Sequence, residues 1–202
     1  MPNQVFPTKG NLIAVKKSLD LARTGYELLD RKRNILVRET MGLLSVAKGI
    51  QSDINHAYHD AYEALQQANI TIGAIDELSR SVPVDMGLSI AYRSVMGVEL
   101  PLVELDERPL MNYYGYSSTN SALDIAFVKF DEVKKLTVKL AGIENSVYRL
   151  ANGIKKTQKR ANALKNIIIP RFEDTVKFIT DALEEKDREE FSRLKVIKKT
   201  KM

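Results

Sequence analysis

Two histidines and two carboxylates lie close together in the first third of the chain, at a spacing that could gather metal ligands. His56, His59, Asp60 and Glu63 occupy positions i, i+3, i+4 and i+7, which share one face of a helix. Imidazole nitrogens and carboxylate oxygens are common zinc ligands. The apolar residues of this segment, such as Ile54, lie on another face, so the four side chains point mostly away from the expected core. We therefore interpret them as a solvated helix face and predict no metal site.

No other pattern in the chain predicts catalysis or cofactor binding. The sequence contains neither a G-x-x-x-x-G-K-[ST] phosphate loop nor a G-x-G-x-x-G turn, and it suggests no Ser/His/Asp set. We predict no catalytic, cofactor-binding or metal-binding residues, no cofactor, and no catalysis by the chain alone.

Clusters of basic residues could contact phosphates. Nucleic-acid binding also calls for aromatic side chains or a groove-reading motif, whereas Tyr113, Tyr114 and Tyr116 lie in an acidic segment. We interpret the clusters as solvated helix flanks, although a protein partner could use their charge. They are Arg31-Lys32-Arg33, Lys155-Lys156 with Lys159-Arg160, and Lys195 with Lys198, Lys199 and Lys201.

Composition indicates a folded protein whose charge is unevenly distributed. Of its 202 residues, 44% are hydrophobic and 28% charged, which argues against disorder. Residues 1–70 carry 9 basic and 7 acidic residues, residues 71–118 carry 3 and 7, and residues 119–202 carry 19 and 12. No cysteine, no long apolar run and no visible secretory signal occur, so we expect a cytoplasmic protein.

Apolar residues recur at alternating steps of three and four over most of the chain. This mean spacing of 3.5 residues is typical of helices that supercoil around a partner helix. The first series is Leu12, Val15, Leu19, Ala22, Tyr26, Leu29, Arg33, Leu36, Thr40, Leu43, Ala47, Ile50, Ile54, Ala57, Ala61, Ala64. The second is Ala122, Ala126, Lys129, Val133, Leu136, Leu140, Ile143, Val147, Leu150, Ile154, Thr157, Ala161, Leu164, Ile168, Arg171, Thr175, Phe178, Ala182.

The segment between the two series has a different character. Prolines and glycines forbid a continuous helix there, and residues 88–92 and 98–102 alternate as in two strands. We predict a β-hairpin that turns near Met96 and Gly97, with Pro101 on an edge strand. Thr8 or Asn11 should cap the first arm, and the polar residues 117–120 the second. The predicted domains are an N-terminal arm (1–70), a connector (71–118) and a C-terminal arm with a basic tail (119–202).

The fold class that follows is all-α dominated: a long antiparallel two-helix coiled coil with a small acidic connector. Arms of similar length joined by a connector most simply fold back on each other, with the numbers of contacting residues adding to about 195. A parallel homodimer is the alternative, but it would leave two different seams to cover in each chain. Pro170 should bend the second arm without ending it, because the apolar series continues beyond it.

Four glycines interrupt the arms and call for an explanation. An interior glycine costs a helix about 1 kcal/mol relative to alanine. Gly42, Gly49, Gly142 and Gly153 could let the two helices approach closely, could admit a third element, or could simply be tolerated in a long helix. In the antiparallel register Gly42 would lie near Gly153 and Gly49 near Gly142, which suggests a soft waist.

Three stretches of the arms resemble the D subunit of the V-type and archaeal-type rotary ATPases. They are FPTKGNL at 6–12 with the lysines, leucines and Gly25-Tyr26 that follow to residue 33, KRANALKNIIIPRFE at 159–173, and REEFSRLK at 188–195. The resemblance is weaker in residues 71–118, where VMGV at 95–98 is the main similarity. The glycines at 42 and 49 are not expected from the family.

The resemblance implies a non-catalytic central shaft that couples ATP synthesis or hydrolysis in a ring of A and B subunits to proton or sodium transport across a membrane. It also implies that both chain ends lie inside the ring, that the F subunit of the stalk binds along the shaft, and that the base meets the subunit capping the membrane rotor. The protein would then be peripheral to the membrane, with no direct insertion and no nucleic acid. A coiled-coil scaffold or nucleic-acid-binding module without a rotary partner is the alternative.

Overall fold

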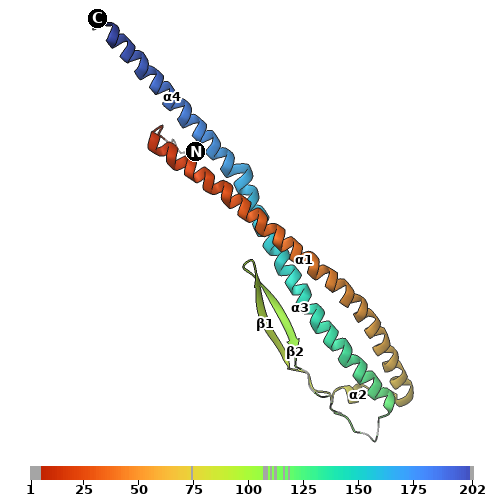
Figure 1. The fold of residues 1–202 in the computed structure, drawn as a ribbon. Coiled ribbons are helices and arrows are strands. Elements are labelled where there is room, and N and C mark those ends of the chain that lie inside the picture. The colour runs from red at the N-terminus through yellow and green to blue at the C-terminus, as the bar shows by residue number, and fades with distance from the viewer. Residues whose placement is uncertain are drawn as a thin grey trace. The chain divides into compact units, whose positions relative to one another are not determined.

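The computed structural model describes residues 6–73, 75–106, 109, 111, 113–115, 117 and 119–200 of the chain. It confirms the predicted fold class, with long helices at both ends of the chain and a hairpin between them (Figure 1). The elements are α1 (Lys9–Ile72), α2 (Asp76–Ser79), β1 (Leu88–Val95), β2 (Val98–Leu105), α3 (Ser121–Ala163), a π turn (Leu164–Ile168) and α4 (Ile169–Thr200).

Side chains and a glycine fix the ends of the helices. Thr8 Oγ1 accepts the N–H of the residue three positions later at 3.2 Å, and Asn120 Oδ1 does the same at the start of α3, also at 3.2 Å. Both confirm the predicted caps. At the other end of α1, Gly73 has a φ of 92° and its N–H donates to Asn69 O at 2.9 Å. Glycine adopts this left-handed conformation without a steric penalty, so the helix ends there.

Packing divides the chain into two units. Unit 1 consists of Met1–Asn34 with Ile154–Met202, and unit 2 of Ile35–Gly153. In unit 1, Arg23 Nη2 lies 2.7 Å from Glu173 Oε1, and Arg33 Nη1 donates to Gln158 Oε1 at 2.9 Å. The partner's number falls as the number on α1 rises, so the helices run antiparallel.

Unit 2 repeats the antiparallel arrangement with the rest of α1 and with α3. The rings of Tyr62 and Phe130 meet edge to face with centroids 5.6 Å apart, and Asn120 Nδ2 donates to Thr71 Oγ1 at 2.7 Å. These residue numbers add to 192 and 191, and Arg23 and Glu173 add to 196. The predicted register is therefore confirmed to within a few residues in each unit.

The predicted seam is confirmed along the whole of α1. Every position of the first apolar series is buried or half-buried, and Leu36 and Ala61 are fully buried. Arg33, which interrupts the series, is half-buried and engages Asp30 at 2.8 Å as well as Gln158. Its charge is therefore satisfied inside the seam.

In the second arm the proline is accommodated by a π turn. The N–H of Ile169 donates to Leu164 O, five residues back, instead of to the residue four back. In an α-helix the ring of Pro170 would clash with the carbonyl of Asn166, and its missing N–H would leave that carbonyl unpaired. The wider turn contains one residue more than an α-helical turn, and the helical path continues through it.

The extra residue changes which side chains are buried beyond the proline. The second series holds as far as Leu164, but three of its later positions are exposed, namely Ile168, Arg171 and Phe178. The residues one place later are buried or half-buried instead: Ile169, Phe172, Val176, Ile179 and Leu183. The predicted seam was wrong by one residue here, because a constant 3.5-residue repeat cannot anticipate a single-residue insertion.

The β-hairpin is present where the sequence predicts it. β1 and β2 pair antiparallel from Leu88↔Leu105 to Val95↔Val98. Met96 and Gly97 have φ values of 50° and 73°, and positive φ at both residues is the signature of a two-residue type I′ turn. Such a turn matches the right-handed twist that paired strands adopt in general, and it fixes the register at the tip of the hairpin.

Candidate functional site

The hairpin of unit 2 rests on a row of small residues of α3, which we call the hairpin groove: Gly142, Ser146 and Gly153. Their spacing of four and seven residues places them on one helix face. A Cβ at Gly142 would lie 3.1 Å from Val103 Cγ2, and one at Gly153 only 2.9 Å from Val98 Cγ2. The glycines are therefore needed where β2 lies against the helix.

The dimensions of the helix and strand agree along the groove. Gly142 and Gly153 are separated by eleven helical residues at about 1.5 Å each, and Val98 and Val103 by five strand residues at about 3.3 Å, so both spans come to about 16.5 Å. Between them, the buried Ser146 hydroxyl lies 3.2 Å from Pro101 O and 2.9 Å from Gly142 O. β2 therefore follows α3 over its length.

Two arginines hold the hairpin to the helices. Arg149 Nη1 donates to Glu99 O at 3.3 Å, and its guanidinium lies 5.5 Å from the centre of the Tyr92 ring. Arg93 Nη2 lies 2.5 Å from Glu39 Oε1 of α1. Arg149 joins both strands to α3 and Arg93 joins β1 to α1, so the hairpin is fixed to both helices of unit 2.

The structure contradicts one interpretation of the four helix glycines and supports another. A Cβ at Gly42 or Gly49 would meet no atom within 4 Å, so the prediction that the two helices approach each other closely at these positions is wrong. Gly142 and Gly153 instead admit a third element, β2, which was the other interpretation of the same residues. A soft waist built from four facing glycines is therefore not formed.

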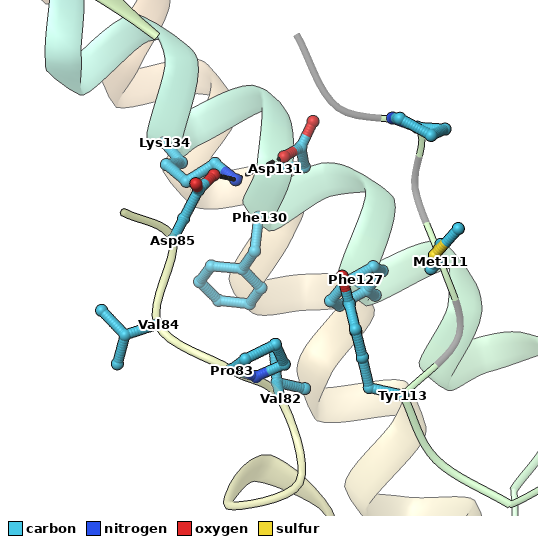
Figure 2. A pocket seen from close by; sticks show the side chains of 11 residues that line it. Val82, Pro83, Val84, Asp85, Met111, Tyr113, Phe127, Phe130, Asp131 and Lys134 are labelled. Atoms are coloured by element: carbon cyan, nitrogen blue, oxygen red, sulfur yellow. Dashed lines mark hydrogen bonds and ion pairs between the residues drawn. The ribbon is translucent and has the colours of Figure 1, made fainter. Parts of the chain in front are cut away.

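An ionic cluster, which we call the clasp, fixes the segment before β1 onto α3 (Figure 2). Lys134 Nζ lies 3.0 Å from Asp85 Oδ2 and 2.8 Å from Asp131 Oδ1, and Lys135 Nζ lies 2.8 Å from Asp131 Oδ2. The other oxygen of Asp85 accepts the N–H of Gly87 at 3.0 Å, which shapes the turn into β1. The carboxylate of Asp85 thus links the connector to α3 and also orders the turn that precedes β1.

Neighbouring charges and hydrogen bonds shift the pKa values of two groups of the clasp. Burial alone would raise the pKa of Asp131, but the hydrogen bonds and charges of Lys134 and Lys135 together lower it below its ordinary value of 3.8. The hydrogen bond to Asp131 raises the pKa of Lys134 above 10.5, assisted by Asp85 and opposed by burial. Both groups are therefore held in their charged forms. The sequence shows the i, i+3 and i, i+4 pairs on α3, but the contribution of Asp85 is set by the fold.

Beside the clasp lies a cavity of about 290 Å³. Figure 2 shows Phe130 and Phe127 pointing into it from α3, opposite Val82 and Pro83. A second, apolar pocket of about 240 Å³ shares both phenylalanines. Lys134, Asp85 and Asp131 line the first cavity, and their ion pairs fix the segment before β1 onto α3.

The histidines and carboxylates singled out in the sequence do not converge. His56, His59, Asp60 and Glu63 are all exposed, with His59 Nδ1 3.6 Å from Glu63 Oε1 and Asp60 bound to Lys129 at 3.7 Å. Among the residues that the structure describes, no three His, Asp or Glu side chains are placed to hold a metal ion.

The basic clusters belong to unit 1, whereas the described tyrosines of the connector belong to unit 2. Within the described residues, the clusters at 155–160 and 195–199 are exposed, while Lys201 lies outside them. Tyr114 is buried and donates to Asp124 Oδ1 at 2.7 Å, so it belongs to the core of unit 2. Tyr113 is exposed and Tyr116 lies outside the described residues.

The end of α4 in unit 1 is a helix whose side chains are all exposed from residue 184 to residue 200. Phe191, Leu194 and Ile197 recur at three-residue steps and have exposed fractions of 68%, 65% and 52%. Lysines and arginines surround them. Over the described residues, no helix is sufficiently long and apolar to span a membrane. Exposed apolar side chains that gather on one side of a helix are typical of a protein-binding surface.

Known proteins match this chain over nearly its full length. The family model for the D subunit of ATP synthase matches residues 11–199. The D subunit of the V-type ATP synthase of Thermotoga neapolitana is 45% identical over 196 residues, which cover 96% of this chain and 97% of the relative. The D subunits of the A-type ATP synthases of Pyrococcus furiosus and Methanobrevibacter smithii are 38% and 39% identical, covering 96% of this chain and 94% and 86% of theirs.

Proposed function

Since the chain belongs to the family of ATP synthase D subunits, as the match over residues 11–199 shows, we propose that it is the central rotor shaft of a V/A-type ATPase. In this role it couples ATP synthesis or hydrolysis in a ring of A and B subunits to proton or sodium transport across the membrane. The observation that carries the proposal is the family match along both arms, which pair antiparallel within each unit.

The physical properties of the arms suit a shaft. A rotor must transmit twist without taking part in the chemistry, and two helices with a continuous seam resist relative sliding. The 3–4 seam of α1 is buried or half-buried at every predicted position, and cross-helix ion pairs such as Arg23–Glu173 add polar contacts at its margin. The shaft itself is non-catalytic in this proposal, and the A and B subunits hydrolyse or synthesise ATP.

The partners follow from the same assignment. Both chain ends lie inside the A/B ring, the F subunit of the stalk binds along the shaft, and the base of the shaft contacts the subunit that caps the membrane rotor. The exposed apolar face of Phe191, Leu194 and Ile197 supports a partner around the end of α4, because such a face is costly to leave in water. The protein is then cytoplasmic and peripheral to the membrane through the complex.

Purification in mild detergent tests the assignment. The tagged chain should recover the A, B and F subunits and membrane rotor subunits, identified by mass spectrometry, together with ATPase activity. Recovery of a nucleic acid or of unrelated proteins, without a P-loop ATPase, would refute the shaft and favour the scaffold alternative.

The isolated chain provides a second test. Among the described residues no three His, Asp or Glu side chains are placed to hold a metal ion, and the sequence contains no phosphate loop. Calorimetry with ATP and Mg²⁺ should therefore detect no binding, while removal of the chain from the complex should abolish ATP-driven ion transport. Submillimolar nucleotide binding by the purified chain would contradict the non-catalytic assignment.

A further inference from the structure

β1 has an outer edge that no strand of the described chain covers. The sheet contains β1 and β2 alone within this part of the chain. In an antiparallel pair, alternate residues direct their N–H and C=O groups to the partner strand and the others direct them outward. The two-residue turn closes on Val95 and Val98, and the Asp106 N–H donates to Gly87 O at 2.9 Å. The outward residues of β1 are therefore Leu88, Ile90, Tyr92 and Ser94.

The opposite edge, on β2, is closed. Its outward carbonyls at Glu99 and Pro101 accept hydrogen bonds from Arg149 and Ser146 of α3. Pro101 has no N–H, so it offers no donor on that side. Figure 1 shows β2 between α3 and β1. A further strand can therefore pair only with β1.

The side chains beside the free edge are apolar and exposed. Leu88, Ile90 and Tyr92 share one face of the hairpin and have exposed fractions of 48%, 53% and 58%. Exposed strand edges are normally protected by charges, prolines or bulges. The one charged residue of β1, Arg93, points to the other face and is bound to Glu39. The edge thus lacks the features that prevent pairing.

We propose that β1 binds an extended segment of a partner protein, which pairs with it as a third strand. Main-chain hydrogen bonds to the outward groups of β1 supply affinity, and alternate apolar side chains of the partner cover Leu88, Ile90 and Tyr92. The exposed carboxylates of Glu99 and Glu104 on β2 favour a segment that also carries lysine or arginine. The hairpin groove holds β2 against α3, so the edge is offered on a fixed support.

Amide hydrogen exchange measures this pairing directly. The experiment compares the free full-length chain with the complex that the tagged chain recovers from cells, after its subunits have been identified. The N–H groups of Ile90 and Tyr92 should exchange at least about tenfold more slowly in the complex, while those of Ala91 and Arg93, already bonded to β2, should change little. Equally fast exchange of the outward amides in both samples overturns the proposal.

The same measurement separates other outcomes. Protection in the free chain that rises with concentration, together with a dimer in sedimentation, would identify a second copy as the occupant and overturn the partner proposal. The inference does not depend on the shaft assignment. A complex without A and B subunits would refute that assignment while leaving the exchange test of β1 intact.

A proline substitution tests the edge itself. Ile90→Pro removes an outward N–H without touching the ladder to β2, and Pro101 shows that the hairpin accepts proline at an outward position. The partner's dissociation constant should rise roughly tenfold, while the Ala91 amide stays protected. The control Ile90→Val keeps the N–H and the branched side chain and should retain the partner. Equal retention by both variants, with the hairpin intact, refutes strand pairing.

Discussion

Alanine in place of the groove glycines should loosen the hairpin, although alanine is the better helix former. At Gly142 an added Cβ would lie 3.1 Å from Val103 Cγ2, 3.3 Å from its Cβ and 3.6 Å from its backbone N. Because a β-carbon and the main chain are involved, a rotamer change of Val103 cannot relieve the contact, and the strand must move. Gly142→Ala should therefore cost roughly 1–3 kcal/mol in overpacking against a propensity gain of about 1 kcal/mol.

Gly153 differs in a useful way. Its closest contact, 2.9 Å, is with a single methyl carbon of Val98, and Leu36 Cδ1 lies farther away at 3.8 Å. Gly153→Ala should thus be destabilising alone but should be relieved in combination with Val98→Ala, which removes the methyl. A favourable coupling energy of roughly 1 kcal/mol in the double-mutant cycle would assign the cost to this contact.

The matched controls lie in the same unit. Gly42 and Gly49 have open space where a Cβ would be, so Gly42→Ala and Gly49→Ala should each raise the free energy of unfolding of unit 2 by about 0.5–1 kcal/mol. Urea titrations give the free energies, and exchange of the Ala91 amide reports the hairpin. If Gly142→Ala is as stabilising as Gly42→Ala and leaves Ala91 protected, the groove does not exclude a methyl group and the reasoning fails.

Two further predictions concern the clasp and the π turn. Because the pKa of Asp131 is lowered in the folded protein, its contribution to the free energy of unfolding is present above about pH 4 and is lost as the pH falls through the folded pKa. The pKa of Lys134 is raised, so its contribution is lost only as the pH rises beyond 10.5. Asp131→Asn should therefore cost roughly 1 kcal/mol at pH 7 and little at pH 2, measured by urea midpoints, and an equal loss at both values would count against the ionic origin. Deleting Asn166 in a Pro170→Ala background should convert the π turn to α-helix and keep the melting temperature of unit 1. Deleting Val176 in the same background should lower this melting temperature markedly, because the residues after the deletion rotate by about 100° around the helix axis. Similar melting temperatures for the two deletions would contradict the one-residue phase shift.

Sequence reasoning succeeded where one physical rule dominates. The 3–4 repeat located the seam of α1 at every position, and a polar residue before each arm located the start of its helix. Alternation with Met96-Gly97 between the runs located the hairpin, because side chains that alternate along a strand and a turn of positive φ leave little freedom.

It failed where a local event changes the phase or where the contact partner is distant in sequence. Pro170 is visible in the sequence, but a bend and a π turn are both compatible with it, and only the latter moves the seam by one residue. Likewise, Gly153 and Gly42 look alike as interruptions of a helix. Their difference depends on β2, which lies about 50 residues from Gly153 along the chain.

The unsupported end of α4 has a consequence for handling the free protein. Residues 184–200 bury no side chain, so their helix depends on its own hydrogen bonds and on the i, i+4 pairs Glu184–Arg188 and Glu189–Arg193, at 3.5 and 3.6 Å. Such pairs contribute roughly 0.2–0.5 kcal/mol each, and isolated helices near this length are marginal in water. We therefore expect the segment to unfold more readily than the rest of α4, and its many lysines and arginines make it the first site that trypsin should cut. The purified chain, with nothing bound to this segment, should shorten from this end.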